Sequence, residues 1–423
     1  MGLSEEFDVR RFLGRGCYSM VYEAFHTEGV DKDKPYAFKR FFLQNPSAIH
    51  CALRERNVLV RLAEEEYQSP FLPTLFYSFT IHGSPTLLLR EGTGCDLFDL
   101  LRSNGLLNES QARFYTSELI SGLEHLHSLG IVHLDLKPEN VLLCLSGHVF
   151  ISDFDRSYDL CRNNKSPSDD DFTGTPLFMA PEIAKGEIIT TKADIWSLAV
   201  LMAELVSGPI RSVAKNLDED LRWAKEGRYA IKAFNRLTKP LQAFFSACFK
   251  RRHQERPDIS GIKGLRFYKH VNWDVVRSCS QQPPILPSSI NHRPDSEAIC
   301  KLDPHDPILL AAAYGKVMPV VRKRLRHAIE LRDDGASKLI TEPPDYEGLS
   351  SAGMTPEVIE RLFANFQFIN PTLRPIVKEI SVGTEVKVEV LPSLFEKTVE
   401  EIEDLEKSFG QNRIRARTCS AGD

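Results

Sequence analysis

The order in which strand-like and helix-like segments follow one another constrains the fold of this chain most strongly. Short β-rich segments separated by Gly, Asp and Lys turns come first, at residues 7–12, 20–25, 36–41, 75–79 and 86–89. One helix is expected among them, at 48–62, where leucine and valine recur at helical spacing. From Asp96 onward helices dominate, at 97–101, 108–129, 192–206 and 239–249. The predicted fold class is therefore α+β, with a β-rich lobe followed by an α-helical lobe.

Composition is ordinary for a soluble globular protein, and it argues against a membrane-spanning protein, a secreted protein and a nucleic-acid-binding protein. The 423 residues are 42% hydrophobic and 26% charged, no run of 18 apolar residues occurs, and the acidic start of the sequence lacks an apolar signal core. Nine cysteines are scattered without a Cys-x-x-Cys pair, which indicates a reducing compartment. The net charge of −5 gives no reason to expect nucleic acid. We therefore expect an intracellular protein, cytoplasmic or nuclear, without a membrane span; its oligomeric state stays open.

Five short segments hold most of the candidate chemistry. They are a glycine-containing turn at 13–21, Lys39 with Glu55, and the sequences His-Leu-Asp-Leu-Lys-Pro-Glu-Asn at 133–140, Asp-Phe-Asp at 153–155 and Gly-Thr-Pro-Leu-Phe-Met-Ala-Pro-Glu at 174–182. Small residues in a turn let the backbone approach a phosphate. Taken alone, the turn is an ordinary hairpin and Lys39 with Glu55 is a solvated pair. The occurrence of all five in this order is the specific signal.

Together these segments resemble eukaryotic-type protein kinases. The octapeptide is similar to the catalytic-loop pattern H-R-D-x-K-P-x-N, the triplet to D-F-G, and the third sequence to G-T-P-x-x-x-A-P-E. Lys137 within the octapeptide resembles Ser/Thr kinases rather than tyrosine kinases. The resemblance implies the bilobal protein kinase fold, with a catalytic domain at 7–270. Its N-lobe would span about 7–90 and its C-lobe about 91–270.

The resemblance also assigns roles in phosphoryl transfer. Asp135 would accept the proton of the substrate hydroxyl or orient that hydroxyl, and Lys137 would neutralise charge on the transferred group. Asn140 and Asp153 would bind Mg²⁺. The residues expected to contact ATP, or to hold a residue that does, are Leu13, Gly14, Arg15, Gly16, Cys17, Tyr18, Ser19, Val21, Ala37, Lys39, Glu55, Leu89, Arg90, Glu91, Gly92, Asp96 and Leu142.

Further positions are implied to support this site. Asp194 would anchor the backbone of the catalytic loop, and Arg256 would pair with Glu182. A buried spine of side chains would connect the two lobes through Leu59, Leu75, His133 and Phe154.

Three departures from the pattern favour an alternative, a pseudokinase scaffold that binds nucleotide or partners without catalysis. Ser19 replaces the third glycine of the usual turn, Leu134 replaces the arginine of the catalytic loop, and Asp155 replaces the glycine of D-F-G. The charged residues retained at the nucleotide, metal and catalytic positions instead favour an active enzyme.

Three later segments resemble the AGC group of Ser/Thr kinases. Residues 267–273 are similar to the end of its catalytic domain, 283–287 to a Pro-x-x-Pro step in its tail, and 363–371 to its hydrophobic motif. The alternatives are the end of an amphipathic helix in an unrelated domain, or a separate binding module within 280–423. The resemblance implies intramolecular docking of Phe363 and Phe366 on the N-lobe helix.

The resemblance and the local patterns divide the rest of the chain into two parts. An AGC-like tail would span 271–380 and contain a helical insert at 306–332 before the hydrophobic motif. The final part, 381–423, would hold an acidic helix at 393–409 and a basic end.

The expected function is ATP-dependent phosphoryl transfer to Ser/Thr hydroxyls of protein substrates. Asp171 replaces the activation-loop threonine, and Gln367 replaces the phosphorylated residue of the tail. With Leu134 in place of arginine, we expect Asp171 to have no arginine partner and activity not to be gated by phosphorylation there. Glu139 and Asp96 predict a preference for basic residues before the acceptor.

Overall fold

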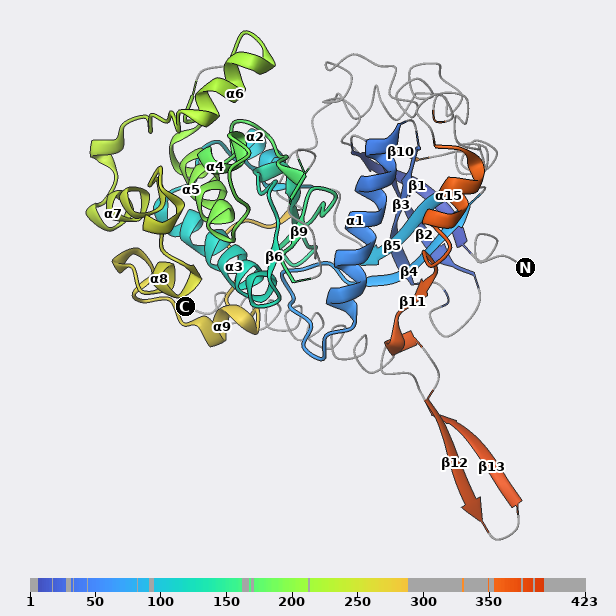
Figure 1. The fold of residues 1–423 in the computed structure, drawn as a ribbon. Coiled ribbons are helices and arrows are strands. Elements are labelled where there is room, and N and C mark those ends of the chain that lie inside the picture. Colours follow the sequence, from blue (N-terminus) through green and yellow to red (C-terminus); the bar gives the residue numbers. More distant parts are fainter. Residues whose placement is uncertain are drawn as a thin grey trace, which may run out of the picture.

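A computed structural model shows two lobes side by side, one rich in strands and one rich in helices (Figure 1). It describes residues 7–287 except 17, 28–31, 33, 44, 82, 91–94, 162–166, 169–170 and 212–213. Beyond residue 287 it describes 329–330, 349, 354–373, 376–382 and 385–391. The arrangement confirms the predicted bilobal α+β class. Within these residues, no helix is both long and apolar enough to cross a membrane.

The N-lobe is built on one antiparallel sheet with strand order β10-β1-β2-β3-β5-β4-β11. Its strands are β1 (Phe7–Arg15), β2 (Ser19–His26), β3 (Pro35–Phe41), β4 (Leu75–Ile81), β5 (Ser84–Arg90), β10 (Ile329–Glu330) and β11 (Phe368–Ile369). The main N-lobe helix is α1 (Pro46–Ala63), and Asn45 caps it by accepting a hydrogen bond from the Ala48 amide at 3.0 Å.

The C-lobe consists of helices and short strands. The helices are α2 (Leu97–Asn104), α3 (Glu109–Ser128), α4 (Pro181–Ala184), α5 (Lys192–Ser207), α6 (Leu217–Lys225), α7 (Lys239–Cys248), α8 (Ile259–Lys263) and α9 (Trp273–Arg277). The short strands are β6 (Ile131–Val132), β7 (Val141–Leu143), β8 (Val149–Ile151) and β9 (Tyr158–Asp159), with a 3-10 turn at Pro138–Asn140.

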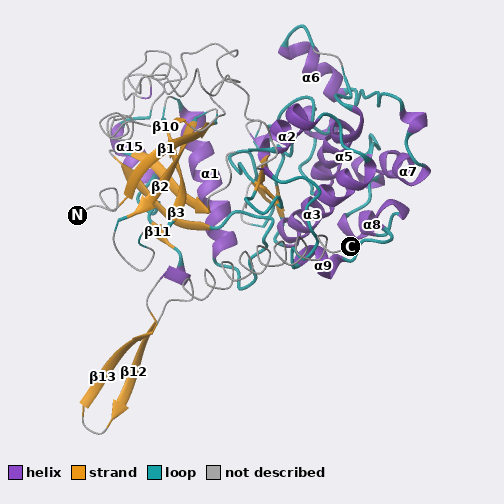
Figure 2. Ribbon diagram, turned by 180° about the vertical axis from the view of Figure 1, so that it is seen from behind, coloured by secondary structure: helices purple, strands orange, loops and turns teal. Residues whose placement is uncertain are grey.

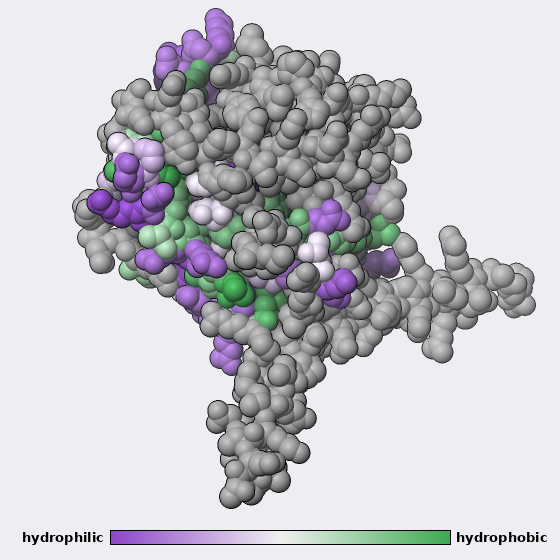
Figure 3. Space-filling view, turned by 90° about the vertical axis from the view of Figure 1, so that its right-hand side faces the viewer, coloured by the Kyte–Doolittle hydropathy of each residue, from purple (hydrophilic) through white to green (hydrophobic). Residues whose placement is uncertain are grey.

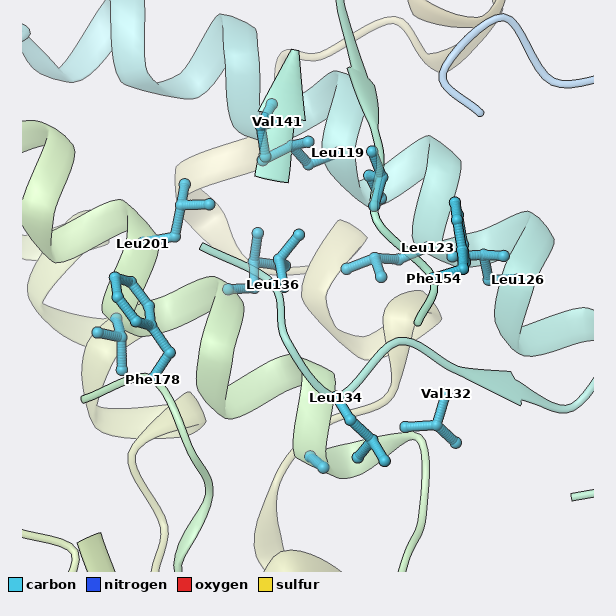
Figure 4. Packing of buried hydrophobic residues seen from close by; sticks show 14 of the residues in the cluster. Leu119, Leu123, Leu126, Val132, Leu134, Leu136, Val141, Phe154, Phe178 and Leu201 are labelled. Atoms are coloured by element: carbon cyan, nitrogen blue, oxygen red, sulfur yellow. The ribbon is translucent and has the colours of Figure 1, made fainter. Parts of the chain in front are cut away.

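The hydrophobic core lies directly beneath the catalytic-loop segment. Leu134 and Leu136 of that segment are buried, and Figure 4 shows them close to Val132, Phe178 and Leu201. Because alternate residues of the segment pack into this core, the polar residues between them are held in fixed positions.

The predicted spine residues Leu59, Leu75, His133 and Phe154 are all fully buried. The rings of His133 and Phe154 lie 5.1 Å apart between centroids, in an edge-to-face arrangement. Of the contacts expected within this spine, the one between His133 and Phe154 is thus present.

The tail follows the sequence prediction only in part. The structure contains α15 (Pro356–Leu362), a 3-10 turn at Pro371–Leu373, and an antiparallel hairpin of β12 (Ile376–Val382) and β13 (Glu385–Leu391), which projects away from both lobes (Figure 2). This hairpin was not predicted. The predicted helix at 306–332 is wrong at 329–330, which form β10 and pair with β1. Its remaining residues, and the predicted helix at 393–409, lie outside the described residues.

Candidate active site

Lys39 lies at the centre of the candidate nucleotide site and contacts two carboxylates from distant segments. It occupies the middle of β3, paired with Val21 on one side and Leu87 on the other. Its Nζ donates to Glu55 of α1, with distances of 2.8 and 2.7 Å to the two oxygens, and to Asp153 Oδ1 at 2.9 Å. The sequence-predicted Lys39–Glu55 pair is thus formed, and Asp153 joins it.

Lys39 and Asp153 stabilise each other's charge. Burial alone would lower the pKa of Lys39, but Asp153 and Glu55 outweigh burial and raise it above its ordinary value. Burial would raise the pKa of Asp153, and Lys39 overcomes this effect and lowers it to about 2. Lys39 is therefore a cation and Asp153 an anion at neutral pH, as phosphate and metal binding require.

Asp135 is held by hydrogen bonds to both of its carboxylate oxygens. Oδ1 accepts from the backbone amide and the hydroxyl of Thr175, at 2.8 and 2.7 Å. Oδ2 accepts from Lys137 Nζ at 2.6 Å and from Asn140 Nδ2 at 3.2 Å. Lys137 also donates to the Thr175 hydroxyl at 2.9 Å. The catalytic loop and the activation segment therefore meet at this carboxylate.

The catalytic loop adopts an unusual backbone that Asp194 supports. Leu134 has a φ of +65°, a left-handed conformation that costs free energy for a residue with a branched side chain. Asp194 of α5 is buried and accepts from the amides of His133 and Leu134, at 2.9 and 3.0 Å, and from His127 Nε2 at 2.9 Å. Burial would raise the pKa of Asp194, but His127 overcomes it and the pKa is lowered. The expected anchor is therefore an ionised carboxylate.

Asn140 and Asp153 form a donor set that suits Mg²⁺. Asn140 Nδ2 donates to the backbone oxygen of Asp135 at 2.8 Å, so the amide oxygen is not used by this bond. One carboxylate and one amide oxygen are hard ligands, and Mg²⁺ commonly keeps waters and substrate phosphates as its remaining ligands. The described residues contain no group of three or more His, Cys, Asp or Glu side chains arranged for a metal.

The turn between β1 and β2 is tight, as a phosphate-covering turn must be. The Gly16 amide donates to the Ser19 carbonyl at 2.9 Å, and a Cβ added at Gly16 would lie 2.7 Å from Ser19 Oγ. Ser19 is buried. Tyr18 of the same turn is half-buried.

The remaining nucleotide candidates lie on strands of the N-lobe and on β7. Leu13 is buried, and Val21, Ala37 and Leu142 are half-buried on β2, β3 and β7. Leu89 and Arg90 end β5 and are half-buried.

The other nucleotide candidates are a helix cap, two residues at the end of β1, and three residues outside the described part of the chain. Asp96 is buried and caps α2 by accepting from the Asp99 amide at 2.8 Å. Gly14 and Arg15 end β1, but nothing is described beyond their backbone. Cys17 and the hinge residues Glu91 and Gly92 lie outside the described residues.

Asp171 has an arginine partner that the sequence reasoning did not identify. Arg54 of α1 pairs with Asp171 Oδ1 at 2.7 Å, and Asp171 Oδ2 accepts from the amide and hydroxyl of Ser168, at 2.8 and 2.9 Å. The expectation that Asp171 lacks an arginine is therefore wrong. The cation comes from the N-lobe helix rather than from the catalytic loop, and helical spacing alone does not reveal which side chain of α1 faces the activation segment.

The activation segment is anchored at its other end by the predicted Arg256–Glu182 pair. The two guanidinium nitrogens donate to the two carboxylate oxygens at 2.6 and 2.7 Å, and both side chains are buried. This bidentate geometry is the strongest form of such a pair.

Two carboxylates with raised pKa values were not identified from the sequence as site residues. Burial, reinforced by Asp153, raises the pKa of Asp155 to about 8, and its buried Oδ1 has no hydrogen-bond partner among the described residues. Burial, reinforced by Glu139, raises the pKa of Glu204 on α5 to about 7. Glu204 falls inside a run of apolar residues, and an acidic residue in such a run was the one available signal.

The hydrophobic-motif residues lie against the N-lobe. Phe363 and Phe366 are buried, and their rings lie 5.2 Å apart. The Phe366 carbonyl accepts from Ser78 Oγ at 2.5 Å and from Arg56 Nε at 3.3 Å, while β11 pairs with β4. Figure 3 shows this end of the molecule, where apolar and hydrophilic residues lie next to one another.

Comparisons with known proteins indicate the family of this chain. The model of the protein kinase domain family matches residues 7–267. Ribosomal protein S6 kinase alpha-6 of Danio rerio is 32% identical over 67% of this chain and 38% of its own length. The Homo sapiens protein of the same name is 31% identical over the same shares. Ribosomal protein S6 kinase beta of Caenorhabditis elegans is 31% identical over 75% of this chain and 55% of its own length. The chain thus spans 38–55% of the length of these relatives.

A family model that covers most of the chain and a described site with the expected charged residues lead to one conclusion. The chain belongs to the protein kinase family, and its S6 kinase relatives place it with the Ser/Thr kinases of the AGC group.

Proposed function

We propose that this protein transfers the terminal phosphoryl group of ATP to Ser or Thr hydroxyls of protein substrates, with Mg²⁺ as cofactor. The observation that carries the proposal is the contact of Lys39 with both Glu55 and Asp153. It joins β3, α1 and the 153–155 segment at one point, where a cation for phosphates and an anion for a metal lie next to each other. The bound Mg²⁺–ATP would supply the phosphoryl group and the charge of the metal.

The residues of the chain would position the reaction rather than form covalent bonds. Asp135 orients the acceptor hydroxyl and accepts its proton, while Lys137, 2.6 Å from Asp135, stabilises negative charge on the transferred group. Thr175 holds Asp135 from the activation segment. Since both Asp135 oxygens already accept hydrogen bonds, its carboxylate is held in a fixed position before a substrate arrives.

We propose that activity does not depend on phosphorylation of the activation segment. Asp171 carries a permanent negative charge at the position of the phosphorylated threonine, and Arg54 supplies the cation. Arg54 is adjacent to Glu55 on α1, so an ion pair that holds Arg54 also favours the helix position in which Glu55 reaches Lys39. A carboxylate has about half the charge of a phosphate, so this anchor is weaker than a phosphorylated one but always present.

The tail segment that contains Phe363 and Phe366 is proposed to support α1 from the opposite side. Each buried Phe contributes roughly 2–3 kcal/mol by removing apolar surface from water. Arg56 of α1 lies over the Phe366 ring at 5.8 Å from its centroid and donates to the Phe366 carbonyl. The contacts reach α1 without any phosphate at Gln367.

A preference for basic residues near the acceptor is proposed from two acidic side chains. Glu139 and Glu204 are both half-buried, and their mutual repulsion helps raise the pKa of Glu204. A cationic substrate side chain would relieve this repulsion. Asp96, the other acidic residue expected here, is buried as the cap of α2, so the preference is assigned to Glu139 and Glu204.

The test is phosphate incorporation into a Ser/Thr peptide library by the wild type, Asp135→Asn and Lys39→Met. We expect incorporation by the wild type and loss by roughly a thousandfold in both variants, since each removes a group on which the transfer step depends. If the wild type and both variants show no transfer although the wild type binds nucleotide, the alternative of a pseudokinase scaffold replaces the proposal.

A further inference from the structure

A second concave region lies in the C-lobe, apart from the site around Lys39 and Asp135. It is a pocket of about 510 Å³ bounded by residues 210–211 after α5, by α6 with the turn that follows it, and by residues 249–251 after α7. Figure 1 shows α6 at the outer edge of the helical lobe. None of the residues that line this pocket belongs to the nucleotide or catalytic sets.

Aromatic rings form part of the pocket wall. Trp223, Tyr229 and Phe249 line it, and Tyr229 stacks on Phe249 with 4.2 Å between centroids and 23° between planes. Although stacked, Tyr229 remains 42% exposed. Rigid aromatic rings that are open to solvent offer contact area to a ligand at low cost in side-chain entropy.

The charged residues of the wall are all arginines. Arg211, Arg228 and Arg251 line the pocket, and no Asp or Glu does. Arg251 is exposed, and its side chain makes no hydrogen bond or ion pair within the described part of the chain. Arg228 pairs with Glu226 at 2.5 Å outside the lining set. The wall therefore presents a net positive charge.

Arg211 connects this wall to the activation segment. Its side chain is 5% exposed and pairs with Asp220 at 3.1 Å, and its buried Nε has no hydrogen-bond partner among the described residues. Burial lowers the pKa of Arg211, and Asp220 offsets this only in part, so a second anion nearby would stabilise the cation. Arg211 Nη2 also donates to the Pro176 carbonyl at 2.7 Å, next to Thr175, which holds Asp135.

We propose that this pocket binds an acidic peptide segment bearing an aromatic or aliphatic side chain, supplied by the protein substrate away from its acceptor residue. Carboxylates match the arginines in charge and in geometry, and an apolar side chain matches the rings. A nucleic acid is the less favoured occupant because the net charge of the chain is −5, which disfavours a long polyanion. The claim that the partner is a substrate rests on the proposed function. The claim that the pocket binds such a peptide is independent of it.

The test measures binding of a fluorescent peptide, Glu-Asp-Asp-Phe-Glu-Asp-Glu, to the full chain without nucleotide, by fluorescence anisotropy. Arg251→Glu and Arg228→Glu are each expected to weaken binding by roughly tenfold, because charge reversal replaces an attraction with a repulsion. Arg252→Glu is the matched control, since Arg252 adjoins Arg251, is 82% exposed and does not line the pocket. It is expected to leave the dissociation constant unchanged.

Three results would overturn the inference. The control could weaken binding as much as the pocket variants, the peptide with all carboxylates changed to amides could bind equally well, or a single-stranded oligonucleotide of equal charge could bind more tightly. Failure here is separable from failure of the proposed function. If phosphate transfer persists without peptide binding, only this inference falls; if binding persists without transfer, only the proposed function falls.

Discussion

At the scale of single residues, the buried charged side chains differ in whether they have an ion-pair partner. Lys39 and Arg256 each contact carboxylates within 3 Å, so their burial is offset by strong local attraction. Glu204 differs, because its carboxylate makes no ion pair with any described residue and its pKa is raised to about 7. A residue of this kind is stabilised when a cation arrives, which suits a binding residue better than a purely structural one.

Glu204→Gln is expected to raise KM by roughly tenfold for a peptide with arginine before the acceptor, with kcat nearly unchanged. The physical reason is the loss of one carboxylate that attracts the substrate cation. Steady-state kinetics measure both constants, and a peptide with alanine in place of arginine is the control. An equal rise in KM for both peptides would contradict the assignment.

The same variant tests the pH dependence of stability. The folded pKa of Glu204 is about 7 against an ordinary value of 4.5, so the folded chain holds a proton that the unfolded chain has lost. This group therefore lowers the free energy of unfolding as pH rises from 4.5 to 7. Glu204→Gln is expected to raise the melting temperature at pH 8 relative to the wild type and to have little effect at pH 4.5. A shift of the same size at both pH values would show that the charge is not responsible.

At the scale of elements, helix α1 contacts three separate segments of the chain. Arg54 contacts the activation segment, Glu55 contacts Lys39, and Arg56 contacts the tail at Phe366. Each of these three consecutive residues thus contacts a different part of the chain. The position of α1 is the property that these contacts set together.

Asp171→Asn is expected to lower kcat about fivefold, which corresponds to roughly 1 kcal/mol, while the global free energy of unfolding changes little. Both side chains are about 80% buried from solvent, so the pair is stronger than a surface ion pair but not fully desolvated. The exchanged variant, Arg54→Asp with Asp171→Arg, is expected to recover part of the lost rate. Rate measurements on all three proteins check this, and no recovery in the exchanged variant would argue against a direct charge interaction.

At the scale of the whole molecule, the tail returns to the N-lobe sheet after leaving the C-lobe. Residues 283–287 contact the C-lobe, where Tyr115 Oη donates to the Ile285 carbonyl at 3.3 Å, and β11 then extends the sheet beyond β4. One chain segment therefore touches both lobes and can stabilise a single arrangement of them.

Phe366→Ala is expected to release the tail from the N-lobe and to cost about 3–5 kcal/mol of local docking energy, because a buried ring leaves a cavity. Limited proteolysis should then cut near residues 354–373, and kcat should fall. Leu362→Ala is the control, since Leu362 is 40% exposed on α15. Equal protease sensitivity of the two variants would exclude a specific role for the Phe366 pocket.

How much the sequence predicted depends on how local each feature is. The helix 48–62 and the helix 192–206 agree with α1 and α5 to within two residues, because apolar spacing and length are local signals. The Lys39–Glu55 and Arg256–Glu182 pairs followed from the family pattern. The Arg54–Asp171 pair, β10 and the β12–β13 hairpin were missed, since each joins segments whose contact depends on tertiary packing or on pairing register.

The central claim is that the chain is a protein kinase whose active shape does not require phosphorylation. The most direct measurement is kcat of the 423-residue chain made in a host without protein kinases, before and after treatment with a broad phosphatase, with Asp135→Asn as the inactive control. The account predicts phosphate transfer well above that control and a kcat that the phosphatase changes by less than about twofold. Transfer that appears only after incubation with a second, activating kinase would contradict it.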